Sequence, residues 1–189
     1  MEFNKVLRKR ASIRKYSSKK IAAEDVIACI QAANLAPSPG NLSLLTFIVV
    51  EEQELKDRLA EACQQDFIKD AGFLVVICSN DKKSNIMYDK RGDKYLKQHA
   101  GAAIENFLLE ITDLGLASCW IGAFSDTMVK TILRIPDEFE VEAILPVALE
   151  SKISKTKQRA KSSLENRIYF DKWKNKFYKR SIDIRSSYM

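Results

Sequence analysis

The order of apolar and polar residues along this chain of 189 amino acids predicts alternating helices and strands. At residues 24–35, apolar side chains recur at three- and four-residue steps, which places Val26, Ile30 and Ala33 on one helical face. The longest pattern of this kind, at residues 95–114, is followed by a glycine that can close a helix. Because helix-sized and strand-sized segments alternate, we expect a mixed α and β domain in which helices cover a sheet.

Short apolar runs and polar stretches predict the remaining elements. The predicted buried strands are residues 46–51, 72–79 and 140–149; residues 118–123 are predicted as a further strand and residues 13–16 as a short extended piece. The other predicted helices are residues 1–8, 54–64 and 126–133. Residues 80–94 are polar and are expected to form a loop.

The composition favours one globular domain with a real core. Apolar residues make up 46% of the chain, which argues against disorder. No apolar run approaches the ~20 residues that a membrane span needs, and the first residues lack the apolar core of a signal peptide. A cytoplasmic location is therefore expected.

Cysteine and histidine usage narrows the chemistry. Cys29, Cys63, Cys78 and Cys119 are widely spaced, and we expect them to be buried, reduced and packed as small apolar side chains. His99 is the only histidine. A structural zinc site or a histidine-dependent catalytic triad would need further partners near it, so neither is expected.

The net charge of +6 is concentrated near the C-terminus. Residues 152–180 carry eleven Lys and Arg against two acids, which leaves 20 basic and 23 acidic residues elsewhere. Five aromatic residues are interleaved with these charges: Tyr169, Phe170, Trp173, Phe177 and Tyr178. This segment is either an arm that packs its aromatic rings on a partner subunit or a surface for nucleic acid or membrane. We prefer the arm, because aromatic residues favour protein interfaces, and expect neither a nucleic-acid nor a membrane partner.

The first candidate site is a basic segment near the N-terminus. In an extended conformation, Arg10, Ser12 and Arg14 lie on the same side of the chain. Two guanidinium groups around a hydroxyl form a suitable phosphate clamp. The alternative is a solvated basic strand; RNA binding is disfavoured because no aromatic residues alternate with the charges.

Three further stretches carry candidate chemistry. The loop at residues 36–41 is rigid and can present a hydroxyl, a carboxamide and backbone groups to a flat heterocycle, although it could simply end a helix. Gly122 allows a flat ligand to approach the backbone closely, whereas the nearby Trp120 could equally belong to the core. Alternating cations at residues 155–159 could reach the same phosphate as Arg10. There is no G-x-G-x-x-G motif, which argues against a dinucleotide fold.

Taken in order, these stretches resemble the FMN-dependent nitroreductase family. Residues 10–16 are similar to its R-x-S-x-R signature, and residues 36–41 to its A-P-S-x-x-N loop. Residues 91–92 and 98–106 resemble the entry into its central helix, and residues 114–122 its most recognisable stretch. The resemblance covers residues 3–165 and implies an α+β fold, an α/β/α sandwich with a mixed, mainly antiparallel sheet, in a domain-exchanged homodimer.

The resemblance also implies which residues contact each part of a bound FMN. The groups implied to hold the phosphate and ribityl chain are Arg10, the Ala11 backbone, Ser12 and Arg14, completed by Lys157 and Arg159. The residues implied to line the flavin ring from the other subunit are Pro37, Ser38, Pro39 and Asn41. Gln65, with Gln64 as the alternative, is implied at the pyrimidine edge, and Ile121 and Gly122 are implied along the ring. No catalytic side chain and no metal ligand is implied.

The implied activity is a ping-pong reaction in which NADH or NADPH reduces FMN and a nitroaromatic, quinone or similar electron-poor acceptor takes the electrons. Residues 1–165 would form the FMN domain and residues 166–189 the basic, aromatic arm. A flavin-dependent dehalogenase or a flavin-cleaving relative is the alternative, but such relatives use longer lid segments than residues 80–94. The acceptor stays open, because residues 41–45 replace the family's N-x-Q-P-W stretch. His99 also stands where aspartate is common, and Pro39 where a small residue is usual.

Overall fold

The computed structural model describes residues 1–80, 82–152, 164 and 167–176. The chain divides into two compact units, residues 1–156 and residues 157–189, which are described separately. In the described part of the chain, none of the helices combines the length and the apolarity that a membrane crossing requires.

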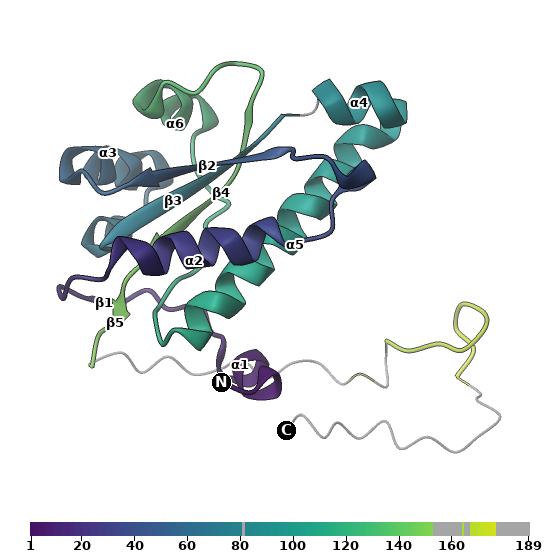
Figure 1. The fold of residues 1–189 in the computed structure, drawn as a ribbon, viewed down its shortest axis with the longest axis horizontal. Coiled ribbons are helices and arrows are strands. Elements are labelled where there is room, and N and C mark those ends of the chain that lie inside the picture. The colour runs from purple at the N-terminus through teal and green to yellow at the C-terminus, as the bar shows by residue number, and fades with distance from the viewer. Residues whose placement is uncertain (81, 153–163, 165–166, 177–189) are drawn as a thin grey trace. The chain divides into compact units, whose positions relative to one another are not determined.

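A three-stranded antiparallel sheet lies at the centre of the first unit (Figure 1). Its order is β2 (Leu45–Val50), β3 (Phe73–Ser79) and β4 (Glu140–Val147). All seven residues of β3 are buried, because this central strand is covered on both faces. A second, two-stranded antiparallel sheet pairs β1 (Tyr16–Ser17) with β5 (Leu149–Glu150).

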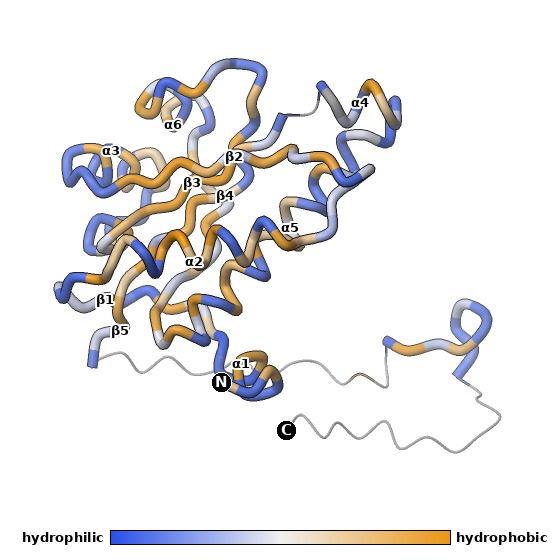
Figure 2. Tube along the Cα trace, in the orientation of Figure 1, coloured by the Kyte–Doolittle hydropathy of each residue, from blue (hydrophilic) through white to orange (hydrophobic). Residues whose placement is uncertain are grey.

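Helices cover both faces of the central sheet. The described helices are α1 (Phe3–Lys9), α2 (Ala23–Asn34), α3 (Gln53–Cys63), α4 (Lys82–Tyr88), α5 (Gly92–Asp113) and α6 (Asp126–Leu133). Val75 and Ile77 of β3 face a core built with α2 and α5, whereas Leu74 and Val76 face a core built with α3 and α6. Figure 2 shows the strands of the central sheet as mostly apolar, whereas apolar and polar residues alternate along the helices around it. The expected α/β/α arrangement is thereby confirmed, and every strand pair described is antiparallel.

The predicted loop at residues 80–94 is wrong, because this stretch is helical. It forms α4, a 3₁₀ turn at Asp89–Arg91 and the first residues of α5. Its apolar side chains point outward, with Ile86 87% exposed. The segment therefore lacks the apolar periodicity from which a helix is predicted. Tertiary contacts hold it instead: Ser84 Oγ donates to the Gly92 carbonyl, and a Cβ at Gly92 would lie 2.7 Å from the Asn85 nitrogen.

The predicted strand at residues 118–123 is also absent as a regular strand. This segment touches β4 through two isolated bridges, Ala117 with Ala148 and Ile121 with Ile144. Cys119 and Ile121 are buried, whereas Trp120 and Ala123 are exposed, and the backbone pairs with β4 only at these two points. The extended piece at 13–16 likewise becomes a strand only at Tyr16, and Ile13 donates its N–H to the Ser118 carbonyl instead.

In the second unit, the described residues 167–176 form a tight turn. The Phe170 N–H donates to the Asn175 carbonyl at 2.9 Å. The rings of Tyr169 and Trp173 lie 4.9 Å apart, and Lys176 Nζ lies 4.4 Å above the Tyr169 ring. The Trp173 side chain remains 80% exposed.

The four cysteines are buried and unpaired, as expected from their spacing. Burial raises the pKa of the Cys63 thiol to about 11, from an ordinary value of 9.0. The folded protein therefore keeps the Cys63 proton in a pH range where the unfolded chain loses it.

The first prediction follows from this difference. Between about pH 8 and about pH 10, the unfolded state binds fewer protons at Cys63, so the free energy of unfolding should fall by about 1 kcal/mol from this thiol. In Cys63→Ala, that part of the loss should disappear, although the variant starts from a lower stability because it leaves a small cavity. Urea unfolding at both pH values, with reductant present, measures the difference. An identical pH dependence in the two proteins would contradict the prediction.

Candidate functional site

The N-terminal basic segment lies against the 118–122 segment. Ile13 N–H donates to the Ser118 carbonyl at 2.9 Å, and Tyr16 Oη donates to the Ile13 carbonyl at 2.8 Å. Tyr16 Oη also lies 3.8 Å from Cys119 Sγ. These contacts bring two of the predicted site segments together, although more than one hundred residues separate them in the chain.

The side chains of the predicted clamp reach the surface. Arg10 follows α1 directly, and its side chain is 25% exposed with Nε 3.5 Å from Glu105 Oε1 on α5. Ser12 and Arg14 are exposed. The two guanidinium groups and the hydroxyl are therefore accessible to an anion, and Glu105 is the acidic neighbour with which an anion would compete for Arg10.

Two ionisable groups beneath the clamp stay protonated. Burial raises the pKa of the Tyr16 phenol well above its usual range and also raises the pKa of the Cys119 thiol. The charge of Arg14 acts in the opposite direction on both groups but is outweighed. The clamp therefore contributes positive charge, while Tyr16 and Cys119 are neutral at neutral pH.

Gln65 lies at the same end of the sheet as the clamp. It follows α3, and its N–H donates to the Ala60 carbonyl at 3.1 Å. The Tyr16 ring lies 6.0 Å from that of Phe67, two residues further along. From the other side, Ser125 N–H donates to the Ala62 carbonyl, which ties the chain after Gly122 to the end of α3. The structure therefore gathers the clamp, Gln65 and the 121–122 segment around one end of the first unit.

Trp120 is not a core residue, because 43% of its surface is exposed. Its indole lies between Gly101 of α5 and Gly122. A Cβ added to either glycine would meet nothing nearer than the Trp120 ring, at 3.9 Å and 3.8 Å. Neither glycine has a positive φ. Neither the backbone conformation nor the packing among the described residues requires glycine at positions 101 and 122. The missing side chain at each position leaves room beside the Trp120 ring.

The loop at Pro37 to Asn41 lies at the opposite end of the sheet. It leads into β2, whose first residue, Leu45, pairs with Ser79, whereas Gln65 precedes the β3 end where Phe73 pairs with Val147. A strand of this length spans roughly 20 Å. Figure 1 shows the same separation between the start of β2 and the β1–β5 pair. Within one chain, the structure does not bring the predicted loop residues to the clamp; these are Pro37, Ser38, Pro39 and Asn41. Two further predicted site residues lie outside the described part of the chain, namely Lys157 and Arg159.

A small cavity opens beside this loop. Its volume is about 190 Å³, and it is lined by the end of α2, the loop, the start of β2 and His99 of α5. His99 is 7% exposed, and its Nδ1 has no hydrogen-bond partner. Sequence reasoning set His99 aside as a lone histidine, because periodicity shows that a helical residue is buried but not that it borders a cavity.

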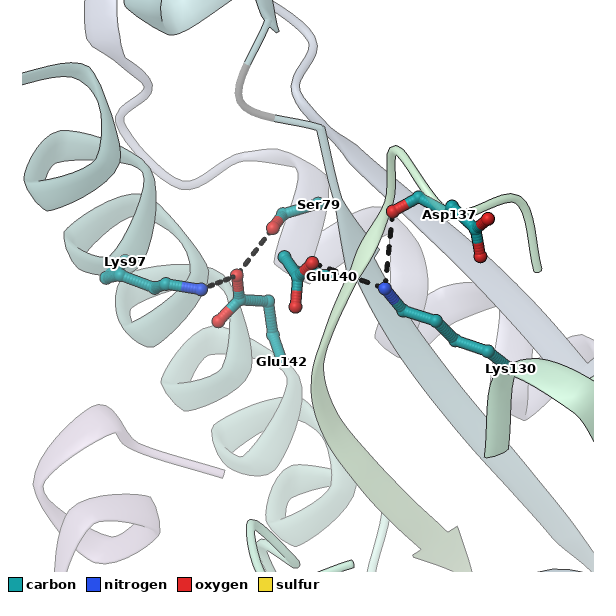
Figure 3. A network of polar contacts seen from close by, with 6 residues as sticks. All are labelled: Ser79, Lys97, Lys130, Asp137, Glu140 and Glu142. Carbon is teal, nitrogen blue, oxygen red and sulfur yellow. Dashed lines mark hydrogen bonds and ion pairs between the residues drawn. The ribbon is translucent and has the colours of Figure 1, made fainter. Parts of the chain in front are cut away.

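A network of polar side chains ties the layers together near the Ser79 end of the sheet (Figure 3). Glu142 of β4 accepts hydrogen bonds from Ser79 of β3 and from Lys97 of α5, the latter at 2.9 Å. Burial alone would lower the pKa of Lys97, but its hydrogen bond to Glu142 and the nearby carboxylates raise it. Lys130 of α6 contacts Glu140 at 3.2 Å. These contacts link α5 and α6 to the sheet, and we assign them a structural role.

The fold and the gathered residues define a three-layer α+β protein in which accessible cationic side chains lie at the same end of the sheet as an exposed glycine, Gly122. The chain belongs to the nitroreductase family, whose family model matches residues 7–68 and 61–149. A protein of Archaeoglobus fulgidus, provisionally named an NADH dehydrogenase/NAD(P)H nitroreductase, is 30% identical over 174 residues, which cover 89% of this chain and 97% of that protein.

Two solved structures show the same fold over most of both chains. A nitroreductase family protein from Clostridium novyi NT superposes with a TM-score of 0.75 at 29% identity, covering 96% of this chain and 100% of that one. An FMN-dependent nitroreductase from Clostridium difficile R20291 superposes with a TM-score of 0.74 at 26% identity, covering 89% and 98% of the two chains.

The second prediction concerns His99. Burial lowers its pKa from the ordinary value of 6.5, so the imidazole should be neutral at neutral pH and titrate below that value. The unfolded chain then binds the proton more readily, and stability should fall as the pH drops through the range just below 6.5. Because the chain has one histidine, NMR titration of its ring signals follows this group alone. A midpoint at or above 6.5 would refute the prediction.

Proposed function

We propose that this protein is an FMN-dependent, NAD(P)H-driven oxidoreductase that reduces nitroaromatic, quinone or similar electron-poor acceptors. Its family membership supports this proposal, as do the names of its relatives, which include an NAD(P)H nitroreductase and an FMN-dependent nitroreductase. When bound, FMN supplies the hydride and electron transfer, from NAD(P)H first and to the acceptor afterwards. The protein's own residues would bind FMN, orient its ring and shield it from water.

The clamp residues fit a phosphate monoester. Arg10 and Arg14 present planar, permanently charged forks, and Ser12 a hydroxyl between them. We propose that these side chains and the Ala11 backbone hold the phosphate and ribityl chain, with Lys157 and Arg159 completing the phosphate site. Binding would draw Arg10 away from Glu105, whose carboxylate is 47% exposed and can return to water at little cost.

The ring of the flavin would lie along the 121–122 segment. Gly122 leaves room for a flat ligand against the backbone, since a Cβ there would meet only the Trp120 indole, at 3.8 Å. Gln65, which is half-buried at the end of α3, can offer its carboxamide to the pyrimidine edge. Ile121 is 2% exposed and anchors this segment to β4 through its bridge with Ile144.

The separation of the two site halves supports a homodimer, and it is the observation that carries the proposal. The clamp and the Pro37–Asn41 loop occupy opposite ends of the sheet in one chain. If both contact one flavin, the loop must come from a second copy, and two-fold symmetry then creates two such sites. Gly101 on α5 is compatible with this arrangement, because among the described residues a Cβ added there would meet only the Trp120 ring, at 3.9 Å.

We further propose that residues 1–165 form the FMN domain and residues 166–189 an arm that packs on the partner subunit. The turn at residues 167–176 supports this role. It holds Tyr169, Trp173 and Lys176 together while leaving most of the Trp173 indole exposed. A large exposed aromatic ring on a rigid turn is typical of an interface anchor.

The third prediction tests the cofactor and the clamp together. Mass spectrometry of the ligand released from purified protein should identify FMN, and NADH or NADPH should bleach its absorbance until a quinone is added. In Arg10→Ala, FMN affinity should fall at least about tenfold, because each charge-assisted hydrogen bond is worth roughly 1.5–3 kcal/mol. Titration of apo-protein with FMN, followed by flavin fluorescence, measures the loss.

Lys9→Ala is the matched control, because Lys9 is an exposed cation that directly precedes Arg10, ends α1 and is not part of the proposed clamp. It should leave FMN affinity nearly unchanged. Equal losses in the two variants would mean that net charge alone attracts the ligand. Unchanged affinity in Arg10→Ala would remove the clamp from the site, and the release of FAD would exclude the proposed cofactor.

The fourth prediction tests whether two chains share each site. Arg10→Ala and Asn41→Ala should each weaken FMN binding at both sites of their own homodimers. In a mixed dimer isolated with two different tags, one site carries both substitutions and the other carries neither. About half of the sites should then bind FMN as the unsubstituted protein does. If Asn41 acted within its own chain, every site of the mixed dimer would carry one substitution and none would recover.

A further inference from the structure

His99 borders the same cavity as the loop that is proposed to reach the flavin. The end of α2, the loop, the start of β2 and His99 of α5 together line this space of about 190 Å³. The loop contributes Ser38 and Asn41 to the lining. A change in the charge of the imidazole therefore acts on a wall of which the loop is a part.

The imidazole is enclosed and has no ionic partner. His99 is 7% exposed, and its Nδ1 has almost no accessible surface and no hydrogen-bond partner. The residues that line the cavity from α2, the loop and β2 include no Asp, Glu, Lys or Arg. On α5, the nearest charged residue along the chain is Lys97, which donates to Glu142 instead. Burial is the single cause that lowers the pKa of His99, so no charged group of a neighbouring element offsets it.

A proton on His99 creates a donor that these surroundings do not satisfy. In the imidazolium ion both ring nitrogens donate, whichever tautomer the neutral ring adopts. Nδ1 would then carry a hydrogen of a buried cation with no acceptor among the described residues, which is strongly unfavourable. The wall around the ring therefore has to move until water or a polar oxygen reaches Nδ1.

The loop is the weakly constrained part of that wall. The end of α2 belongs to one of the two cores, and β2 pairs with β3 at all six of its residues. The 3₁₀ turn at Pro39–Asn41, in contrast, is closed by two backbone hydrogen bonds of 3.2 Å. Asn41 also has a φ of 56°, a left-handed conformation that costs a residue with a side chain some energy. The loop should therefore open before the helix or the strand does.

We propose that His99 is a positioning residue for the Pro37–Asn41 loop: the neutral imidazole allows the loop to close, and protonation releases the loop and weakens FMN binding. The effect on the loop follows from the cavity alone, whereas the effect on FMN rests on the proposed function. The closed loop is stable at neutral pH. Its stability is lost as the pH falls through the pKa of His99, which lies below the ordinary value of 6.5.

Hydrogen exchange tests the loop without relying on a flavin. Exchange of a peptide covering residues 38–44 is measured in the protein as purified, at about pH 7.5 and about one pH unit below the His99 midpoint found by NMR. His99→Gln is the matched variant, because its carboxamide stays neutral at both pH values. The chemical pH dependence of exchange is the same in both proteins. At the lower pH, loop protection should be about threefold or more weaker in the unsubstituted protein than in His99→Gln.

Titration with FMN measures the consequence for the cofactor. A phosphate monoester itself titrates at about pH 6, so FMN affinity should fall in acid in both proteins. Between the same two pH values, it should fall about threefold more in the unsubstituted protein than in His99→Gln, whereas at about pH 7.5 the two should bind FMN alike. Adding Gln98→His to His99→Gln moves the histidine to the exposed neighbouring position and should not restore the acid response.

Three results would overturn the proposal: equal loop protection in the two proteins at the lower pH, a His99 midpoint at or above 6.5, or global unfolding before His99 titrates. If His99→Gln does not fold, a peptide covering β3 in the unsubstituted protein is the reference, and the loop alone should lose protection in acid. A loop that responds while FMN affinity does not would overturn the link to FMN. Absence of FMN binding at about pH 7.5 would contradict the proposed function instead, and the exchange measurement would still decide the role of His99.

Discussion

The complete burial of β3 is the constraint on which the rest of the structure depends. Each of its seven residues is buried, and its alternating side chains enter two different cores. A strand of this kind is stable only if apolar layers cover both faces, which α2 and α5 provide on one side and α3 and α6 on the other. The largest fully buried side chain, Phe107 of α5, lies in the first of these cores.

Because the two cores take up the faces of the sheet, the polar chemistry is left to its ends. At one end, the Ile13 to Ser118 hydrogen bond places the clamp beside the segment that leads to Gly122. At the other end lie the Pro37–Asn41 loop, the His99 cavity and the network centred on Glu142. A ligand that needs groups from both ends has to meet two chains, and this explains why a split site and a homodimer belong together in the proposal.

The ionisable groups follow the same division between interior and ends. The partly buried Tyr16 and the buried Cys119 and His99 are all neutral at neutral pH, because burial disfavours the charged form of each. Charge is retained where water or a close partner is available, as for Arg14 at the surface and for Lys97 beside Glu142. The chemistry proposed for the protein is accordingly one of binding and orienting a cofactor that carries out the reaction.

The sequence by itself determined the layers, the central strand and the candidate residues. Helical periodicity at 24–35 and the apolar run at 72–79 reflect burial directly, and the order of motifs from Arg10 to Gly122 was sufficient to indicate the family. Tertiary structure decided what depends on neighbours far away in the chain. The helix α4 shows a second limit of periodicity: Ile86 points outward, and the helix is held by the packing of Ser84 and Asn85 against the nearby Gly92.

Tertiary structure also reduced the 118–123 segment to two bridges and left Trp120 at the surface. It set the loop and the clamp at opposite ends of the sheet, and it placed His99 at a cavity. None of these features has a local signature, because periodicity records whether a side chain meets protein or water. Which distant segment it meets, and whether a gap remains there, is settled only when the layers pack.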